Sequence, residues 1–217
     1  MVICEHTDIY RAFYTKSDSI VNYMVKRLEV LPHQRVLEPC AGDGVFIDAI
    51  LKKHAGLHID AYELHPEAIA KLHQKYTGFP NVKPYHDDTL INIDLFFYAN
   101  MGGIYDRIIA NPPYGAWQDY EKRELLKKLF DGIYVKETYA LFLYRCIQLL
   151  REDGRLVFIL PNTFLHLHMH TRLRAFILRN TQIIEIAIFP PSLFPGISFG
   201  YGELCIITLL KKTGGDA

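Results

Sequence analysis

The stretch RVLEPCAGDG, residues Arg35–Gly44, decides the expected fold, because a short apolar strand runs directly into a glycine-containing turn. Gly42 and Gly44 let the backbone turn tightly and approach a ligand at the carboxyl end of that strand. The dinucleotide fingerprint G-x-G-x-x-G needs a third glycine where this chain has Ile47, so pyrophosphate is not the favoured ligand. Glu38 at the strand end suits a cationic partner such as an amino group. The alternative is an ordinary strand-to-helix turn.

Short β-rich runs alternate with helical stretches over most of the chain, which predicts an α/β fold with a largely parallel sheet. A loop rich in proline and glycine joins the last two runs, so we expect an antiparallel pair that closes one edge. The sequence thus predicts a seven-stranded, mostly parallel, Rossmann-like sheet flanked by helices, with the last strand antiparallel. The expected strands are Arg35–Glu38, His58–Glu63, Val82–His86, Tyr105–Ala110, Arg155–Leu160, Ile183–Phe189 and Glu203–Leu210.

Two helices stand out between these strands. The apolar residues of Ser19–Leu28 form one face of a helix. Tyr139–Leu150 is apolar nearly all round, which predicts a buried crossover helix ending at the turn Asp153-Gly154. No internal repeat or low-complexity linker interrupts the chain, so residues 1–217 are expected to form a single domain.

The composition excludes several classes of protein. Half of the 217 residues are apolar, and 24 Lys+Arg balance 24 Asp+Glu, so any nucleic-acid contact must be local or shared with a partner. No run approaches the roughly 20 apolar residues of a membrane span, and the N-terminus has acidic residues where a signal peptide would be apolar. The cysteines form no C-x-x-C pair and indicate reduced thiols of a cytoplasmic protein: Cys4, Cys40, Cys146 and Cys205.

Acidic residues follow three successive strands of the expected sheet. Glu63 ends the second strand, where a carboxylate can accept both hydroxyls of a ribose. Asp87 and Asp88 follow the third strand, where a carboxylate can accept a hydrogen bond from an adenine amino group. Together with Glu38, these acids describe a pocket for a nucleoside with a nearby positive charge, such as S-adenosylmethionine.

The segment Asn111-Pro112-Pro113-Tyr114 directly follows the fourth strand. The prolines fix φ and leave carbonyl groups free to accept hydrogen bonds. The Asn111 carboxamide oxygen and the Pro112 carbonyl can together hold the two hydrogens of an exocyclic amine. Tyr114 offers a flat face for stacking a planar base, worth roughly 1–3 kcal/mol. The alternative is a proline-rich turn without chemistry.

From about Tyr10 to Lys212 the chain resembles a known family, the N6-adenine DNA methyltransferases of the gamma arrangement, the TaqI-like group of restriction-modification systems. The segments that carry the resemblance are FYTKSDSIVNYMV, RVLEPCAGDGVF, AYELHPEAI, HDDTL, NPPYG, ALFLYRCIQLLREDGRLVFILPNTFL and LFPGISFGYGELCIITLLKK. The resemblance implies that residues 1–30 cover the cofactor and that residues 31–217 form the core sheet of an S-adenosylmethionine-dependent methyltransferase.

The resemblance also implies roles for individual residues. Asn111, Pro112, Pro113 and Tyr114 are the implied catalytic residues, and Phe194 is a second aromatic wall for the base. The target adenine of double-stranded DNA would leave the stack, and its N6 would attack the sulfonium methyl directly, with no covalent intermediate and no metal. The implied cofactor-binding residues are Tyr14, Thr15, Glu38, Pro39, Cys40, Ala41, Gly42, Glu63, Leu64, Asp88 and Asn111.

Three further features have more than one interpretation. The Pro-Cys pair ending at Cys40 is similar to the nucleophile of cytosine-C5 methyltransferases, but it lies in the cofactor loop, so we expect a small buried thiol. The basic stretch Lys122–Lys128 is either a solvated helix face or a contact for DNA phosphates. Three alternating histidines are expected to face the surface or DNA rather than a metal: His166, His168 and His170.

The gamma family carries a target-recognition domain after its last motif, whereas this chain ends shortly past Lys212. We therefore expect either a catalytic domain cut from a longer methylase, slightly favoured, or a subunit whose specificity comes from another polypeptide. A cognate restriction endonuclease is a possible partner.

Other substrates stay open. They are an RNA base and the glutamine amide of a release factor, although only 34 residues precede Arg35, where glutamine methyltransferases carry a helical substrate domain. Cytosine N4 is also open, although such enzymes more often have serine in place of Asn111. A non-catalytic subunit that binds cofactor or DNA is the alternative from another class.

Overall fold

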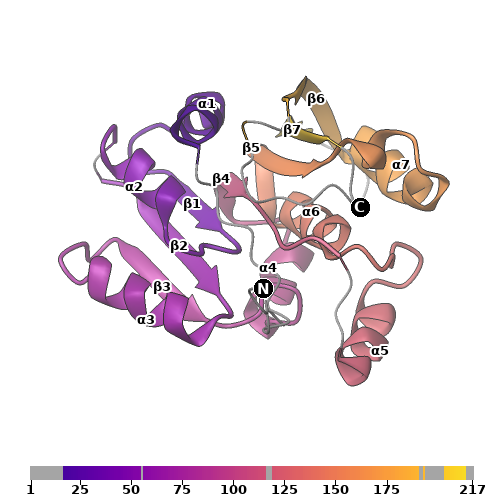
Figure 1. Ribbon diagram of the computed structural model, residues 1–217, viewed down its shortest axis with the longest axis horizontal. Coiled ribbons are helices and arrows are strands. Elements are labelled where there is room, and N and C mark those ends of the chain that lie inside the picture. The colour runs from indigo at the N-terminus through magenta and orange to yellow at the C-terminus, as the bar shows by residue number, and fades with distance from the viewer. Residues whose placement is uncertain (1–16, 55, 116–118, 191–192, 194–202, 214–217) are drawn as a thin grey trace, which may run out of the picture.

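The computed structural model describes residues 17–54, 56–115, 119–190, 193 and 203–213. Within these residues a seven-stranded sheet has the order β3-β2-β1-β4-β5-β7-β6 (Figure 1). The strands are β1 Arg35–Glu38, β2 His58–Glu63, β3 Val82–His86, β4 Tyr105–Ala110, β5 Leu150–Pro161, β6 Thr181–Ile188 and β7 Leu204–Lys211. The helices are α1 Asp18–Leu28, α2 Val45–Leu51, α3 Pro66–Lys75, α4 Ile93–Asn100, α5 Tyr120–Leu129, α6 Thr138–Leu149 and α7 Thr171–Asn180.

The pairing of the strands confirms the expected sheet. β1 to β5 pair in parallel, and β7 lies antiparallel between β5 and β6. The carboxyl ends of β1, β2, β3 and β4 therefore meet at one edge of the sheet, and this edge positions the candidate site. The fold is the expected α/β sheet flanked by helices, with the last strand antiparallel.

The first four strands have the predicted bounds, because each is a short run between polar or glycine-rich turns. The crossover helix ends within one residue of the predicted Leu150, but the turn predicted after it at Asp153-Gly154 and the predicted strand start at Arg155 are wrong. α6 ends at Leu149, and β5 begins at Leu150 without an intervening turn. The expected turn lies inside β5, where Asp153 adopts φ +57° and the pairing with β4 shifts register. A Cβ at Gly154 would lie 2.8 Å from the Arg151 carbonyl oxygen, which is too close, so this bulge favours glycine.

Helices cover both faces of the sheet. α1 packs on α2 and against β4, β5 and β7, whereas α6 packs on α4, α7 and β5. Ten of the twelve residues of α6 are buried, which confirms the prediction of a buried crossover helix. The core is therefore continuous across the sheet.

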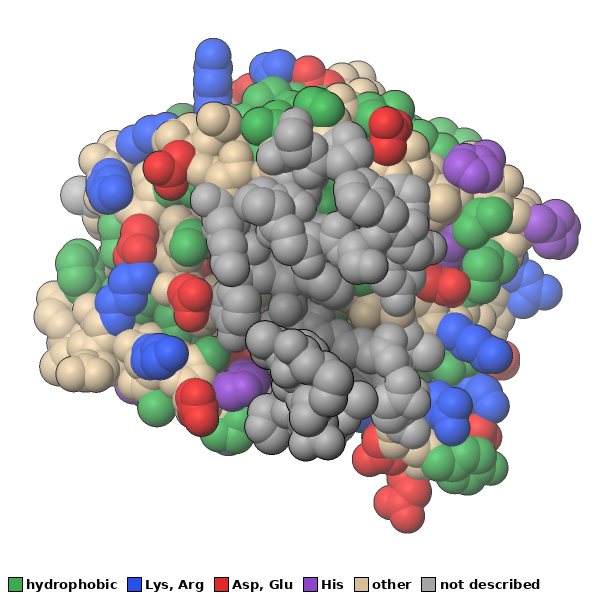
Figure 2. All heavy atoms as spheres, viewed as in Figure 1, with side chains coloured by type: hydrophobic (Ala, Val, Ile, Leu, Met, Phe, Trp, Pro, Cys, Tyr) green, Lys and Arg blue, Asp and Glu red, His purple; other side chains and the backbone are tan. Residues whose placement is uncertain are grey.

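Two observations concern membrane-spanning helices and the charge of the surface. Among the described residues, no helix is long and apolar enough to cross a membrane. On the face shown in Figure 2, basic and acidic side chains are interspersed over the described surface. This mixture matches the balance of 24 Lys+Arg and 24 Asp+Glu.

Candidate active site

The loop after β1 is shaped by two glycines in the left-handed region, Gly42 at φ +52° and Gly44 at φ +74°. A side chain at Gly44 would collide with the Tyr76 hydroxyl, which donates a 2.9 Å hydrogen bond to the Gly44 carbonyl. The Ala41 amide donates to the Tyr62 carbonyl at 2.8 Å. The loop is thus tied to β2 and to the end of α3, and its conformation requires glycine.

Glu38 ends β1 as a buried carboxyl group with 2% exposure. Burial raises its pKa well above the usual range, and the nearby charges of Glu63 and Asp48 raise it further. Among the described residues, its buried Oε2 has no hydrogen-bond partner. A buried acceptor without a partner is costly, so a ligand that donates hydrogen bonds, above all a cation, fits this place.

Glu63 at the end of β2 is held by two backbone amides. Its Oε2 accepts from the Gly42 amide at 2.7 Å, and its Oε1 accepts from the His65 amide at 2.7 Å. Each carboxylate oxygen has a second lone pair for a ligand hydroxyl. The predicted ribose-binding acid is therefore oriented before any ligand binds. Next to it, the Leu64 carbonyl contacts Nε2 of His86 at 3.2 Å.

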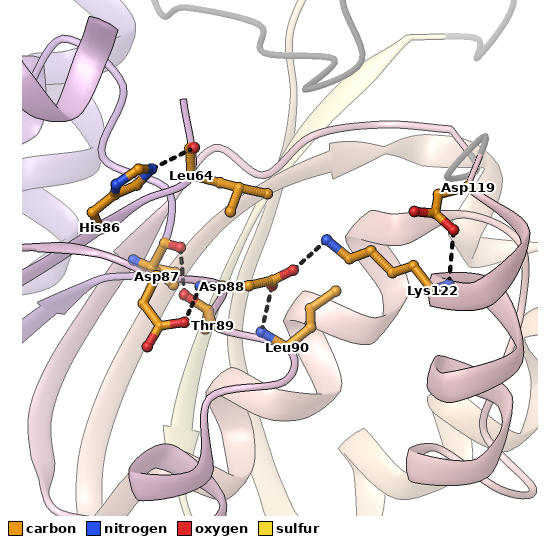
Figure 3. A network of polar contacts seen from close by, with 9 residues as sticks. Leu64, His86, Asp87, Asp88, Thr89, Leu90, Asp119 and Lys122 are labelled. Atoms are coloured by element: carbon orange, nitrogen blue, oxygen red, sulfur yellow. Dashed lines mark hydrogen bonds and ion pairs between the residues drawn. The ribbon is translucent and has the colours of Figure 1, made fainter. Parts of the chain in front are cut away.

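The two aspartates after β3 differ in their surroundings (Figure 3). Asp87 is exposed, and its carboxylate accepts from the Asp88 amide at 2.7 Å and from the Asn92 side chain at 2.6 Å. Asp88 is buried, its Oδ1 accepts from the Leu90 amide at 2.9 Å, and its Oδ2 pairs with the Lys122 ammonium. Asp88 is therefore the better placed of the two for a buried ligand group.

The segment after β4 adjoins the loop after β1. The Cys40 thiol donates to the Asn111 carbonyl at 3.3 Å. Burial raises the pKa of Cys40 well above its ordinary value, so the thiol stays protonated and can donate. Both prolines follow Asn111, and Pro112 is buried whereas Pro113 is partly exposed. The predicted catalytic segment and the predicted cofactor loop are therefore in direct contact.

Tyr114 has a different environment from the one expected for a base-stacking side chain. Its ring is 1% exposed and packs edge-to-face on Tyr139 with a centroid distance of 6.1 Å. Its hydroxyl donates to Asn111 Oδ1 at 2.8 Å. In this conformation the Tyr114 ring is covered, and a base reaches it only after a rearrangement. Stacking on Tyr114 stays a prediction.

His170 lies in the core, so the expectation that it faces the surface or DNA is wrong. It is fully buried, and its Nε2 lies 2.9 Å from the Tyr139 hydroxyl. Burial, and then the charge of Arg174, lowers its pKa from 6.5 to about 4. His166 and His168 are exposed as expected. Among the described residues, no cluster of three metal-binding side chains occurs.

The buried imidazole predicts a pH-dependent stability. Between about pH 6.5 and 4, unfolded His170 binds a proton that the folded form excludes, so the free energy of unfolding falls as the pH falls, by about 3 kcal/mol over this window. Urea unfolding measured from pH 7 to 4 should show this loss. The variant His170→Gln should show a flatter profile, and the exposed control His168→Gln should match wild type. Parallel profiles for wild type and His170→Gln would contradict the assignment.

Sequence reasoning missed two contacts of the site. Thr89, 1% exposed, donates its hydroxyl to the Pro39 carbonyl at 2.7 Å and joins the loops after β1 and β3. Lys122, which belongs to the basic stretch expected to be solvated or to contact DNA phosphates, pairs with Asp88. For the contact between Thr89 and Pro39, the one signal in the sequence is that Thr89 directly follows Asp88. The expected cofactor and base contacts at Tyr14, Thr15 and Phe194 lie outside the described residues.

Comparison with known proteins agrees with this architecture. Residues 46–194 match the family Eco57I restriction-modification methylase. The chain is 32% identical over 161 residues to the Type II methyltransferase M.AccI of Acinetobacter calcoaceticus, covering 70% of this chain and 28% of that protein. It is 29% identical over 185 residues to the Type II methyltransferase M.TthHB8I of Thermus thermophilus, covering 79% of this chain and 40% of that protein. The chain therefore spans less than half the length of these relatives.

A solved structure shows the same fold. It is a putative class I S-adenosylmethionine-dependent methyltransferase from Listeria monocytogenes, which matches with a TM-score of 0.69 and 18% identity. The match covers 92% of this chain and 60% of that one. At this identity the match shows the fold alone.

Proposed function

Because the chain belongs to the Eco57I restriction-modification methylase family, we propose that it transfers a methyl group from S-adenosylmethionine to the N6 amino group of adenine in double-stranded DNA. The observation that carries this proposal is the hydrogen bond from the Cys40 thiol to the Asn111 carbonyl. It brings the cofactor loop after β1 against the Asn-Pro-Pro-Tyr segment after β4, as a transfer between neighbouring ligands requires.

Both the family and the fold imply S-adenosylmethionine as the cofactor. The residues present fit it: Glu38 has a buried acceptor for an ammonium, Glu63 has two fixed oxygens for a ribose, and Asp88 has a buried carboxylate for an adenine amino group. When bound, this cofactor supplies an electrophilic methyl group on a sulfonium.

Catalysis rests on holding the target amine. Asn111 Oδ1 and the Pro112 carbonyl accept its two hydrogens and direct the nitrogen lone pair toward the methyl group. Tyr114, whose hydroxyl now donates to Asn111 Oδ1, stacks on the base after the loop rearranges. The Cys40 thiol holds the Asn111 backbone in register with the cofactor loop. The chemistry is positioning and electrostatics, with no covalent enzyme intermediate.

The partners follow from this reaction. The substrate is an adenine flipped out of duplex DNA. Readout of the target sequence comes from a target-recognition domain, on the same or a separate polypeptide, because base edges are read in the grooves. The restriction-modification names of the family and of a relative, the enzyme and methyltransferase RM.Eco57I of Escherichia coli, support a cognate restriction endonuclease as a candidate partner.

A substrate comparison tests the proposal. The chain is incubated with tritiated S-adenosylmethionine and, separately, duplex DNA, transfer RNA or a release factor. Label in duplex DNA is the expected result. Label confined to RNA or to the release factor would contradict the DNA substrate while retaining the amine chemistry of Asn111. No label in any substrate, with cofactor bound, would contradict catalysis by this chain alone.

Glu38 predicts a pH dependence of cofactor binding. Its raised pKa keeps the carboxyl protonated in the free protein at pH values where an ordinary glutamate is ionised, and an ammonium ligand favours the ionised form. Binding should therefore release a proton, and it should strengthen as the pH rises through the raised pKa of Glu38. Calorimetric titration of S-adenosylhomocysteine in buffers of different ionisation enthalpy counts this proton. Glu38→Gln should bind more weakly without proton release, and equal proton release in both proteins would refute the assignment.

A further inference from the structure

The carboxylate of Asp88 has an internal cationic partner. Oδ1 of Asp88 accepts from the Leu90 amide at 2.9 Å, and the Lys122 ammonium lies against Oδ2 (Figure 3). The side chains of Asp88 and Lys122 are 6% and 15% exposed, and Oδ2 itself is buried. Because Oδ2 is buried and lies against the ammonium, a hydrogen-bond donor that approaches it competes with Lys122.

Lys122 comes from a lightly anchored element. It lies in the first turn of α5, where the Asp119 side chain caps the helix by accepting from the Lys122 amide at 3.0 Å. Leu126 is the one buried residue among the ten of α5. Since only one side chain within this helix is buried, the ion pair to Asp88 contributes to its attachment.

We propose that Lys122 is a displaceable cation that neutralises Asp88 while the pocket is empty and gives way to the 6-amino group of the cofactor's adenine. This inference rests on the proposed function, because it concerns how the same pocket recognises the cofactor. Breaking the ion pair between Lys122 and Asp88 offsets part of the free energy gained when the adenine 6-amino group donates to Asp88. Lys122 therefore sets how strongly the site distinguishes a 6-amino from a 6-oxo purine, and its release loosens α5.

The 6-oxo analogue shows why the discrimination depends on Lys122. A carbonyl at the purine 6-position can accept from the Lys122 ammonium while Lys122 stays beside Asp88. Without Lys122, the same carbonyl faces an unpaired carboxylate, which repels it. Removal of the lysine should thus favour the 6-amino ligand and disfavour the 6-oxo ligand.

Calorimetric titration of S-adenosylhomocysteine and S-inosylhomocysteine tests this. In Lys122→Met, the 6-amino ligand should bind roughly fivefold more tightly than in wild type, as expected for loss of a partly screened ion pair. The 6-oxo ligand should bind more weakly, so the affinity ratio widens roughly tenfold or more. Lys122→Arg, which keeps the charge, and Lys128→Met, an exposed change on the same helix, should keep the wild-type ratio.

Hydrogen exchange gives a second readout without any substitution. S-adenosylhomocysteine should increase amide exchange in residues 120–129 of wild type. An unchanged ratio in Lys122→Met, weaker binding of the 6-amino ligand by that variant, or protection of α5 by the ligand would overturn the inference alone. Failure of wild type to bind S-adenosylhomocysteine would overturn the proposed function, and this inference with it.

Discussion

Asn111→Ala is expected to lower kcat for methyl transfer by roughly a thousandfold, while cofactor affinity changes little. The variant loses the carboxamide oxygen proposed to hold the target amine. It keeps the backbone carbonyl that accepts from the Cys40 thiol, so the loop should stay attached to the cofactor site. Single-turnover methylation with saturating cofactor, together with calorimetric titration of S-adenosylhomocysteine, separates the two effects.

Asn100→Ala is the matched control, because Asn100 is an exposed residue at the end of α4. It should keep wild-type transfer. A wild-type kcat for Asn111→Ala would show that the Asn111 side chain takes no part in the reaction. Loss of cofactor binding in Asn111→Ala would show that Asn111 acts through the cofactor site, the other role that the resemblance implies, and would contradict its role in holding the amine.

Glu63→Gln is expected to weaken the binding of S-adenosylhomocysteine roughly 100-fold, from the loss of charge-assisted hydrogen bonds worth about 1.5–3 kcal/mol each. The glutamine side chain, although close to glutamate in size, should not restore binding. Both oxygens of Glu63 accept from backbone amides, of Gly42 and His65, so the glutamine NH₂ would face an N–H donor. The substitution therefore both removes the ribose acceptor and loosens the loop.

Calorimetry measures this affinity, and circular dichroism checks that the fold is intact. The control Glu67→Gln lies nearby at the start of α3 and is exposed, so its affinity should equal that of wild type. Tight binding by Glu63→Gln would show that the ribose, and with it the cofactor orientation, is placed elsewhere.

The sequence predicted most of the sheet because its strands are short, largely apolar runs that end at or near glycine, proline or acidic residues. It could not predict the start of β5. The left-handed Asp153 and the register shift there depend on pairing with β4, which is distant in sequence. The geometry of parallel strand ends also explains why acids from β1, β2 and the segment after β3 share one edge.

The contacts that the sequence did not predict join segments that only the folded chain brings together. Lys122 reaches Asp88 across 34 positions of sequence, and Thr89 reaches Pro39 across 50. His170 is buried because a 3₁₀ turn before α7 directs it to Tyr139, although its neighbours at alternating positions are exposed. The alternating pattern in the sequence gave no reason to expect one of the three histidines to be buried and the other two exposed.

The central claim is that the segment Asn111–Tyr114 methylates the exocyclic amine of adenine in DNA. The most direct test is nucleoside mass spectrometry of duplex DNA after incubation with the wild-type chain and S-adenosylmethionine that carries a deuterated methyl group. Deuterated N6-methyldeoxyadenosine, missing with Asn111→Ala, is the predicted result. Deuterated N4-methyldeoxycytidine as the product, or a yield of N6-methyldeoxyadenosine equal to wild type from Asn111→Ala, would contradict it.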